Sequence, residues 1–530
     1  MSGPLAHAGR VLLRLAGPRQ LPGIVRALRQ TRTSPATVIR IAALCQPHSP
    51  GLIDERGTLT FADLDDAGAR LAAGLADRHG VQAGGTVAIM CRNHRGFVIG
   101  SLAAGWLGAD LVYLNTEFSA RQIAQAIANP RPDLVIADAE FLPRFAGTPV
   151  PVVVGWPEPD IPDHSTVDDL VLAHDRLPPV GRVRAGTITI LSSGTTGEPK
   201  GAPRKPNTRS LLGPLVTLLG RCRLTPGEPI LIAPPLFHGL GLVVWTLAGI
   251  LRSPVVLRRG FDPLALLSDV DCHRAAMVAA VPVMLQRVLA LPDEARARHR
   301  HDSLRTVLSG GAPLRPELAE RLLAAFGDVL FNGYGSTETG IAAVATPADL
   351  RAAPGTVGRP TLGVPVRVLD ADRRPAPIGQ TGEIFVGGPL VFSGYSGGGS
   401  KETAHGLMNS GDLGHFDAHG RLFVDGRADD MIVSGGENVY PQEVEDILAR
   451  HPRVADAAVI GVDDTEFGQR LVAYLVPRGQ RPEPAELAAY VKDNLARYKV
   501  PRDFVFLDAL PRNATGKLLR RQLPGEGERL

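Results

Sequence analysis

The chain has 530 residues, of which 44% are hydrophobic and 21% charged, and its net charge is +3. This length exceeds one ordinary domain and allows large buried cores, whereas no apolar run approaches the roughly 20 residues that a transmembrane helix needs. The four cysteines are scattered without CxxC spacing, which argues against a disulfide framework or a zinc site and favours a reducing cytoplasm.

The first 50 residues are predicted to form a basic amphipathic arm. Residues 1–53 contain no acid and seven arginines, which are Arg10, Arg14, Arg19, Arg26, Arg29, Arg32 and Arg40. Leu21, Ile24, Val25 and Leu28 follow helical spacing, and Arg26 and Arg29 fall on another side. Two interpretations remain open: a helix resting on anionic lipid at the inner face of a membrane, or a helix docked on the rest of the protein.

An arginine-rich, acid-poor start also resembles an organellar transit peptide. However, arginine dominates the whole chain, which has only six lysines. This skew favours a GC-rich bacterial source and a cytoplasmic protein without a targeting signal. No nucleic-acid partner is expected.

After the arm, strands and helices alternate in two series. The first has predicted strands at 86–90, 111–115 and 133–138 and helices at 96–107 and 119–128. The second runs from a strand at 229–235 to a strand at 329–335, with helices near 240–251, 264–273, 282–291 and 316–325. Such alternation predicts two doubly wound parallel sheets covered by helices.

The sequence pattern changes twice after this α/β region. Between about 355 and 425 the chain has glycine-punctuated short strands, typical of a small β-barrel. After Arg427, predicted helices at 441–450 and 484–495 alternate with strands in an α+β unit able to fold separately. We therefore predict a large domain of residues 51–428 and a small mobile domain of residues 429–530.

The stretch LSSGTTGEPKGAPR, residues 191–204, is the first candidate for chemistry. Glycines with hydroxyl side chains supply many donors at one place, which suits phosphate oxygens, although a solvated turn has the same composition. The familiar nucleotide motifs do not match, because the only Gly-Lys pair is Gly516-Lys517, followed by Leu518.

Three further motifs carry candidate groups. YGSTETG, residues 334–340, places Thr337 and Glu338 beyond the carboxyl end of a strand, where ligands of α/β sheets collect. Glu338 could bind Mg²⁺ beside phosphates or merely cap a helix. Asp412 could accept hydrogen bonds from ribose, Arg427 could face a phosphate, and PRNATGK presents Lys517 near the end of the chain.

Taken together, SSGTTGEPKG, YGSTETG, GDLGHFDAHGRLFVDGR and PRNATGK resemble, in order and spacing, the motifs of the adenylate-forming superfamily. This superfamily includes acyl-CoA synthetases, nonribosomal peptide adenylation domains and luciferases. The resemblance covers residues 52–523 and implies an enzyme that uses ATP, Mg²⁺ and, as co-substrate, coenzyme A.

The resemblance also implies a role for each motif residue. The loop around the β- and γ-phosphates would comprise Ser192, Ser193, Thr195, Thr196 and Lys200. The adenine slot would comprise Gly311, Ala312, Pro313, Asn332, Gly333 and Tyr334. Thr337 would contact the α-phosphate, Glu338 would hold Mg²⁺ and Asp412 would bind the ribose, with Arg427 nearby.

The remaining implied roles concern the adenylation of the acid, the later transfer of the acyl group to coenzyme A, and the hinge that switches the enzyme between these two steps. Asp429 matches the hinge, and Lys517 the adenylation lysine. Gly435 and Gly436 would line a pantetheine tunnel, and His238 would stand between this tunnel and the acyl pocket.

The first half-reaction needs a cation more than a base, because a carboxylic acid is already ionised at neutral pH. Its obstacle is repulsion between the carboxylate and the triphosphate, and the compact ammonium of Lys517 could offset that repulsion.

The segment PPLFHGLGLVVWTLAGIL, residues 234–251, resembles the helix beside the acyl pocket. No acid occurs between residues 231 and 260, so nothing there would pair with the ammonium of an amino acid. We therefore predict a fatty acyl-CoA synthetase for medium or long chains, with a fatty acyl-AMP ligase serving a carrier protein as the alternative.

Two further alternatives come from other classes. A hydrolase is suggested by Gly394-Tyr-Ser396-Gly-Gly398, which satisfies GxSxG but lacks the strand-turn-helix context that this motif requires. A non-catalytic lipid- or nucleotide-binding relative is disfavoured by the presence of both Lys517 and Glu338.

Overall fold

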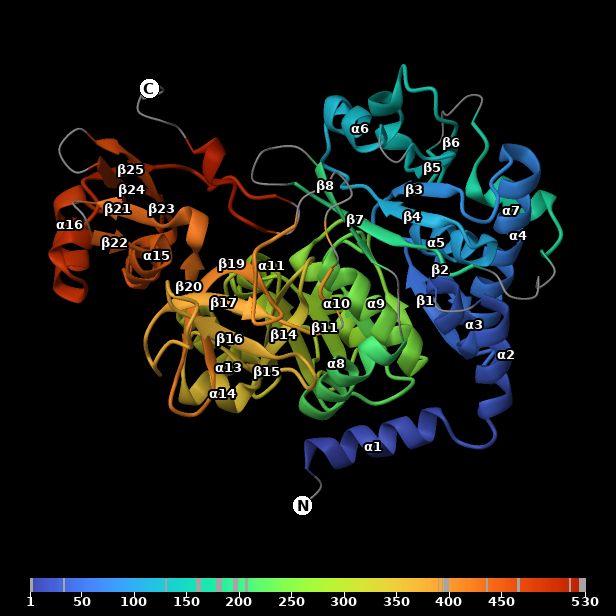
Figure 1. Ribbon diagram of the computed structural model, residues 1–530, viewed down its shortest axis with the longest axis horizontal. Coiled ribbons are helices and arrows are strands. Elements are labelled where there is room, and N and C mark those ends of the chain that lie inside the picture. The colour runs from blue at the N-terminus through green and yellow to red at the C-terminus, as the bar shows by residue number, and fades with distance from the viewer. Residues whose placement is uncertain are drawn as a thin grey trace.

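The computed structural model describes residues 3–31, 34–128, 131–158, 164–177, 184–193, 199–204, 208–388, 390–392, 394, 400–434, 437–464, 468–513 and 516–523. Two large sheets with their helices form an N-terminal domain, and a smaller α+β domain follows and lies beside it (Figure 1). The predicted α/β fold class is thereby confirmed.

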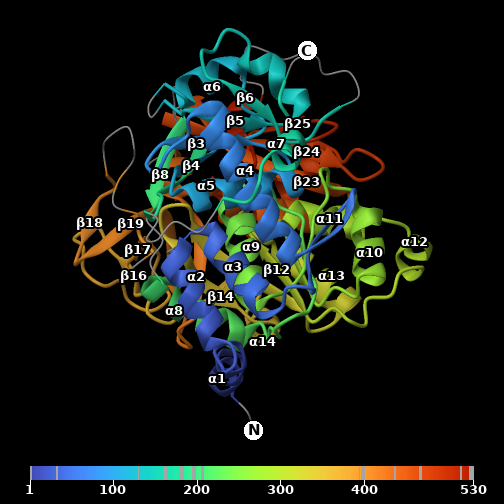
Figure 2. The same ribbon diagram turned by 90° about the vertical axis from the view of Figure 1, so that its right-hand side faces the viewer.

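The arm forms three helices, followed by a hairpin: α1 (Pro4–Leu15), α2 (Leu21–Thr31), α3 (Pro35–Cys45), β1 (Pro50–Asp54) and β2 (Gly57–Thr60). α1 packs on α8 (Thr208–Arg221) and buries Ala8, Val11 and Leu15, so the arm is docked on the large domain (Figure 2). In α2 the buried residues are Ala27 and Thr31, whereas Leu21, Val25 and Leu28 of the predicted apolar stripe are exposed and Ile24 is half-buried.

The first sheet has six strands in the order β6-β5-β3-β4-β7-β8. These are β3 (Thr86–Met90), β4 (Asp110–Tyr113), β5 (Leu134–Ala137), β6 (Val152–Val154), β7 (Ile188–Ser193) and β8 (Pro199–Arg204). All pairs are parallel except β7 with β8, which form a hairpin. The connecting helices are α4 (Phe61–His79), α5 (Arg95–Leu107), α6 (Ala120–Ala126), η1 (Ala139–Phe145) and α7 (Val167–Ala173).

The second sheet runs parallel through the predicted second series. Its strands there are β9 (Ile230–Ile232), β10 (Val255–Val256), β11 (Met277–Ala280), β12 (Thr306–Gly310) and β13 (Leu330–Ser336), and β14 (Gly340–Ala345) returns antiparallel to β13. The helices are α9 (Gly239–Leu251), α10 (Pro263–Cys272), α11 (Pro282–Leu289), α12 (Asp293–Ala297), α13 (Pro316–Phe326) and α14 (Pro347–Ala352). Proline opens α10, α11, α13 and α14 because its missing N–H is one that a helix start leaves unused.

The glycine-punctuated region forms an antiparallel extension of this second sheet. It consists of β15 (Thr356–Pro360), β16 (Val366–Leu369), β17 (Gly382–Val386), β18 (Thr403–Ala404), β19 (Leu407–Phe416) and β20 (Leu422–Arg427). β15 pairs with β14 on one side and β20 on the other, so the small β unit is continuous with the main sheet.

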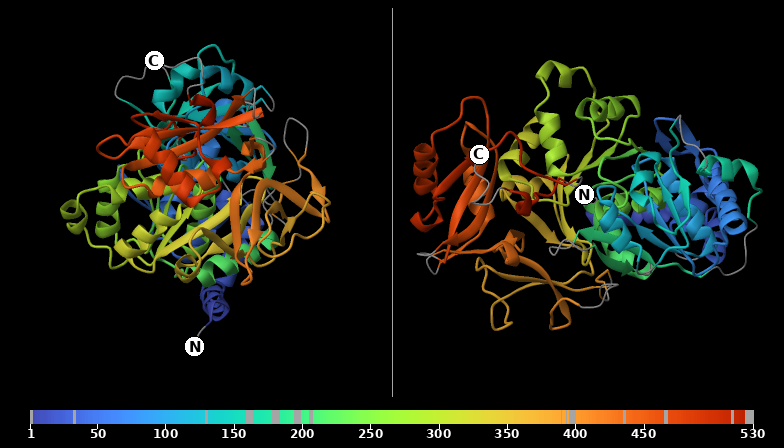
Figure 3. Two further views of the ribbon diagram at one scale, coloured as in Figure 1. Left: turned by 90° about the vertical axis from the view of Figure 1, so that its left-hand side faces the viewer. Right: turned by 90° about the horizontal axis from the view of Figure 1, so that it is seen from above.

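The C-terminal domain has its own five-stranded sheet and core (Figure 3). Its elements are η2 (Ala428–Asp430), β21 (Ile432–Ser434), β22 (Glu437–Val439), α15 (Pro441–Arg450), β23 (Val454–Asp464), β24 (Gly468–Pro477), α16 (Pro484–Asn494), η3 (Arg497–Lys499), β25 (Asp503–Phe506) and η4 (Arg520–Gln522). α15 and α16 cover the sheet and bury Val444, Leu448 and Leu487.

One large apolar core joins both sheets of the N-terminal domain. Phe97 of α5 stacks on Tyr113 of β4 and meets Trp245 of α9 edge-on, with ring centroids 4.9 and 6.1 Å apart. This core holds the ends of the two sheets in a fixed relation. Within the described ranges, no helix combines the length and apolarity needed to span a membrane.

Candidate active site

The residues predicted for the adenine slot lie toward the carboxyl ends of the neighbouring parallel strands β12 and β13 of the second sheet. Gly310, the last residue of β12, pairs with Gly333 of β13, and Ser309 pairs with the buried Asn332. The turn Gly311-Ala312-Pro313 begins directly after β12, and Gly311 adopts a φ of +81°, which favours glycine. The six residues therefore border one another although they come from two segments.

Tyr334 links the predicted adenine slot to Asp412, the residue predicted to bind the ribose. Its phenol donates a hydrogen bond of 2.6 Å to Asp412 Oδ2, and Arg427 Nη1 lies 3.3 Å from Asp412 Oδ1. Asp412 and Arg427 are paired across β19 and β20. Burial, followed by the neighbouring Asp412 carboxylate, raises the pKa of Tyr334 well above its usual value, so the phenol stays protonated as a donor.

The turn between β13 and β14 holds Thr337 and Glu338. Ser336 and Thr339 fasten this turn, since the backbone N–H of Ser336 donates to Thr339 Oγ1 and that of Glu338 donates to Ser336 Oγ, at 3.0 and 3.2 Å. The Glu338 carbonyl accepts from Phe392 N–H at 2.9 Å. Both Thr337 and Glu338 are thus carried on a hydrogen-bonded turn at the carboxyl end of β13.

Phe392 connects that turn to the phosphate-loop hairpin. Its side chain packs with Met408 and with Ala202 of β8. β8 pairs with β7 so that Ser192 lies opposite Lys200, and Phe392 connects this hairpin, at Ala202, to the Glu338 turn. Thr195 and Thr196 lie outside the described residues.

His238 precedes the first residue of α9, at the same end of the sheet. Leu240, two residues later, lies beside Gly310, because a Cβ added to Gly310 would be 3.8 Å from Leu240 Cδ2, an ordinary van der Waals contact. His238 Nε2 is buried, with no hydrogen-bond partner among the described residues, and burial lowers the pKa of His238 to about 4. The imidazole is therefore neutral at physiological pH and presents an unsatisfied polar atom inside the protein.

The loop that carries Lys517 docks on the large domain. A Cβ on Gly516 would lie 2.5 Å from Val283 Cγ1 and 3.4 Å from Val281 Cγ2, so only glycine allows this close approach. Val281 also borders Gly311. Asn513 shapes the loop, because its side chain accepts from Lys517 N–H at 2.8 Å and its backbone N–H donates to the Lys517 carbonyl at 3.0 Å. Lys517 itself is exposed.

A chain of charged contacts, which we call the arginine relay, joins the large domain to this loop. Arg315, immediately before α13, lies 3.2 Å from Asp456 Oδ1 and donates to the Ala457 carbonyl at 2.7 Å. Arg512 donates to Asp456 Oδ2 at 2.7 Å and to the Gly516 carbonyl at 2.9 Å. Asp456 is therefore held between one arginine from each domain.

Two more contacts strengthen this interface. Arg450 of α15 pairs with Glu317 of α13 at 2.5 Å, and Gln286 of α11 donates to the Ala455 carbonyl at 3.3 Å. Asp446 lies beside them, with its Oδ1 3.9 Å from Arg315 Nε. Burial raises the pKa of Asp446 to about 7 despite that arginine.

The arginine relay and the hydrogen bonds that close the Glu338 turn are not predicted from the sequence. Arg512 and Asn513 stand inside the quoted PRNATGK motif, and an asparagine before Gly516 is a turn signal that could have been used. Arg315 and Asp456 offer no such signal, since their pairing depends on domain docking. Asp429 lies in η2, and its role as the hinge stays a prediction. Gly435, Gly436 and Ser396 lie outside the described residues.

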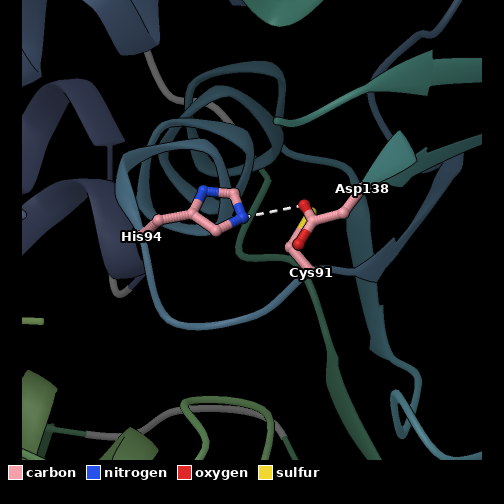
Figure 4. A group of neighbouring side chains, drawn as sticks. All are labelled: Cys91, His94 and Asp138. Carbon is pink, nitrogen blue, oxygen red and sulfur yellow. Dashed lines mark hydrogen bonds and ion pairs between the residues drawn. The ribbon is translucent and has the colours of Figure 1, made fainter. Parts of the chain in front are cut away.

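A second group of polar side chains lies elsewhere, between β3 and β5. Cys91, His94 and Asp138 are buried, and their potential metal-ligand atoms lie within 4.8 Å of one another (Figure 4). His94 Nδ1 accepts from Gly96 N–H at 3.0 Å, and Nε2 contacts Asp138 Oδ1 at 2.7 Å. Because both ring nitrogens are engaged, this group fastens the start of α5 to the sheet rather than offering a binding site.

Comparison with known proteins identifies similarity over most of the chain. The model of the family described as AMP-binding enzyme matches residues 39–396, and that described as AMP-binding enzyme C-terminal domain matches residues 443–517. A feruloyl-CoA synthase from Amycolatopsis sp is 35% identical over 490 residues, covering 91% of this chain and 96% of that protein. A 2-succinylbenzoate–CoA ligase from Bacillus subtilis is 34% identical over 485 residues, covering 90% and 95%.

A solved structure shares the same fold. The o-succinylbenzoate CoA synthetase from Bacillus subtilis, in complex with its acyl-adenylate intermediate, superposes with a TM-score of 0.80 at 32% identity. The similarity covers 92% of this chain and 98% of that one.

Proposed function

We propose that this chain, which belongs to the AMP-binding enzyme family and is an AMP-forming acid–thiol ligase, activates a fatty acid of medium or long chain with ATP and transfers it to coenzyme A. The products would be acyl-CoA, AMP and pyrophosphate. A cytoplasmic location, with peripheral contact at the inner face of the membrane through the arm, belongs to the same proposal.

The observation that carries the choice of acid is the chemistry around the start of α9. Residues 231–260 include no acid, and the pKa of His238 is low enough to keep its imidazole neutral. Within this region, residues 234–251 contain no Asp, Glu, Lys or Arg, and such a border favours an uncharged, apolar tail, because burying an unpaired charge there would be costly. The names of the relatives include aromatic acids, so an aromatic acid is the competing substrate class.

In the first half-reaction, a carboxylate oxygen of the acid attacks the α-phosphorus of ATP. A new O–P bond forms, the bond between the α-phosphorus and its bridging oxygen breaks, and pyrophosphate leaves. Lys517 would offset the repulsion between the two anions, and Thr337 would position the α-phosphate. The docked loop supports this role because Gly516 and Gly311 both border Val281.

The nucleotide would be held by the convergent segments. We assign the adenine to the edge Gly311–Pro313 and Asn332–Tyr334, the ribose to Asp412, and the β- and γ-phosphates to Ser192, Ser193, Thr195, Thr196 and Lys200. Arg427 would keep Asp412 oriented, as its contact with that carboxylate suggests.

Glu338 fits a magnesium site in its donor chemistry, because a carboxylate at a strand end beside a phosphate loop is the type of ligand that Mg²⁺ takes. Bound there with ATP, Mg²⁺ would neutralise phosphate charge.

In the second half-reaction, the sulfur of coenzyme A attacks the acyl carbonyl, the bond to the phosphate oxygen breaks and AMP leaves. We propose that residues 429–530 rotate about Asp429 between the two steps, so that Lys517 withdraws. Gly435 and Gly436 would then line the path of the pantetheine, with His238 between that path and the acyl tail.

The test is a pyrophosphate-release screen across linear acids from acetate to oleate, with ferulate and indoleacetate as aromatic competitors. Octanoate or longer acids should give the highest kcat/KM, and AMP should appear only when coenzyme A is present. A preference for an aromatic acid would overturn the fatty-acid assignment. Accumulation of acyl-AMP that coenzyme A does not discharge would instead support an acyl-AMP ligase for a carrier protein.

A further inference from the structure

The outer faces of α1 and α2 expose apolar side chains in an unusual concentration. Among the described residues, the exposed large hydrophobic side chains include five in the arm, which are Leu5, Leu13, Leu21, Val25 and Leu28. Only six others are spread over the remaining described residues. Leu5 and Leu13 are 70% and 76% exposed, values that exclude a role in the core.

These side chains occupy the side of each helix that faces away from the protein. α1 turns Ala8, Val11 and Leu15 inward, and α2 turns Ala27 and Thr31 inward. The three exposed residues of α2 are spaced i, i+4 and i+7, which places them in one stripe along the helix. The docking of the arm, therefore, uses one face and leaves a second apolar face uncovered.

Exposed arginines flank this second face. Arg10 and Arg14 lie on α1, Arg19 lies between the helices, and Arg26 and Arg29 lie on α2. Over the described ranges, none of these five is joined to an acid by an ion pair, whereas the buried Arg40 of α3 pairs with Asp65. Five uncompensated cations beside an apolar stripe favour an anionic partner with an apolar interior.

We propose that this face, named here the arm surface and comprising the five exposed hydrophobic residues and the five exposed arginines, binds a membrane that contains anionic lipid. The leucines and the valine insert between the acyl chains, and the arginines contact lipid phosphates. Nucleic acid would give the apolar stripe no partner, and a second copy of the arm would bring arginines together, so a lipid surface fits both features. The inference rests on the peripheral membrane contact included in the proposed function and specifies its residues and lipid, but it does not depend on which acid the enzyme activates.

The test is co-sedimentation of the full chain with phosphatidylcholine vesicles that contain 0 or 30% phosphatidylglycerol, at low and high salt. We expect binding to the anionic vesicles only, weakened by salt. Arg26→Gln with Arg29→Gln should lower the partition coefficient about 25-fold, at about fivefold for each arginine near the surface. Leu21→Ser with Leu28→Ser should also reduce binding.

Matched controls come from exposed residues outside the arm. Leu172→Ser, at a leucine that is 83% exposed on α7, and Arg298→Gln with Arg300→Gln should bind like the unmodified chain. All variants should keep their activity on a short water-soluble acid, because the arm contributes no residue to the candidate active site.

Three results would overturn the proposal. The first is no binding to anionic vesicles, and the second is binding that the arm variants leave unchanged. The third is an arm-dependent dimer in size-exclusion chromatography without lipid, which would show that a second copy covers the arm surface.

Discussion

Replacing Arg315 with alanine tests whether the arginine relay holds the lysine loop in place. Arg315 makes an ion pair with Asp456, a longer one of 3.9 Å with Asp446 and one charge-assisted hydrogen bond to Ala457, and its side chain is only 21% exposed. Together these contacts are worth about 2 to 3 kcal/mol, which is about a 30- to 150-fold change in an equilibrium constant. The ratio of docked to undocked molecules should fall by this factor.

The assay separates the two half-reactions. Acid-dependent exchange of pyrophosphate into ATP reports adenylation, and we expect Arg315→Ala to slow it at least tenfold, because Lys517 is presented only when the loop is docked. Discharge of chemically prepared acyl-AMP by coenzyme A should keep its rate if the C-terminal domain rotates away for that step. Arg315→Lys should restore part of the exchange, since it returns the charge without the two-pronged geometry.

Arg321→Ala is the matched control, because Arg321 is an exposed arginine of α13, the helix that Arg315 immediately precedes. An Arg315→Ala enzyme with normal exchange would refute the relay. Equal losses in both half-reactions would show instead that the substitution harms the fold.

Three other predictions concern single side chains. Lys517→Ala should lower the exchange rate by about 10² to 10³, judged from the loss of one positioned charge-stabilising group, and a residual discharge of acyl-AMP would distinguish this from unfolding. Tyr334→Phe should raise the KM for ATP about tenfold, because Asp412 loses a hydrogen bond of 2.6 Å; an unchanged KM would remove Asp412 from the ribose site. Asp446 has a pKa raised to about 7, so the folded protein retains a proton that the unfolded chain releases near pH 4. Stability should therefore fall as the pH rises from about 4 to about 7 and level off above that range. Asp446→Asn should flatten this part of the dependence in thermal unfolding, and an unaltered slope would contradict the assignment.

Local sequence signals predicted the helices well. The helix expected at 441–450 is observed as α15, Pro441–Arg450, and that expected at 96–107 begins one residue earlier. In α15 a proline at the first position and apolar residues at helical spacing specify both the start and the buried face. Such signals lie within one turn or two, so they are readable without the tertiary structure.

The docking of segments could not be predicted in the same way. The stripe on α2 was recognised from its spacing, but spacing does not tell which face packs, and the smaller Ala27 proved to face inward. Arg315 and Asp456 are 141 residues apart in sequence and belong to different domains. Their pairing, like the raised pKa of Asp446, results from the relative placement of two units that each fold around their own core.

The candidate active site was predictable in part: its motifs are local, like the helix signals, but the contacts between them depend on docking. The motifs were found in the sequence, and the structure adds which of them touch: Tyr334 with Asp412, and the lysine loop with Val281. The fastening of the Glu338 turn by Ser336 and Thr339 was not anticipated, because hydroxyl side chains form such bonds only once a turn has closed.

The position of Arg427 has a mechanical consequence. It contacts Asp412 and is also the last residue of β20, so η2 starts at the next peptide bond. A sugar bound by the Asp412 carboxylate, as proposed, would compete for the same oxygens as Arg427 and so would loosen a contact that lies next to the proposed hinge. Binding and release of the nucleotide would therefore act directly on the proposed hinge at Asp429, and no longer chain of contacts would be needed to couple the two.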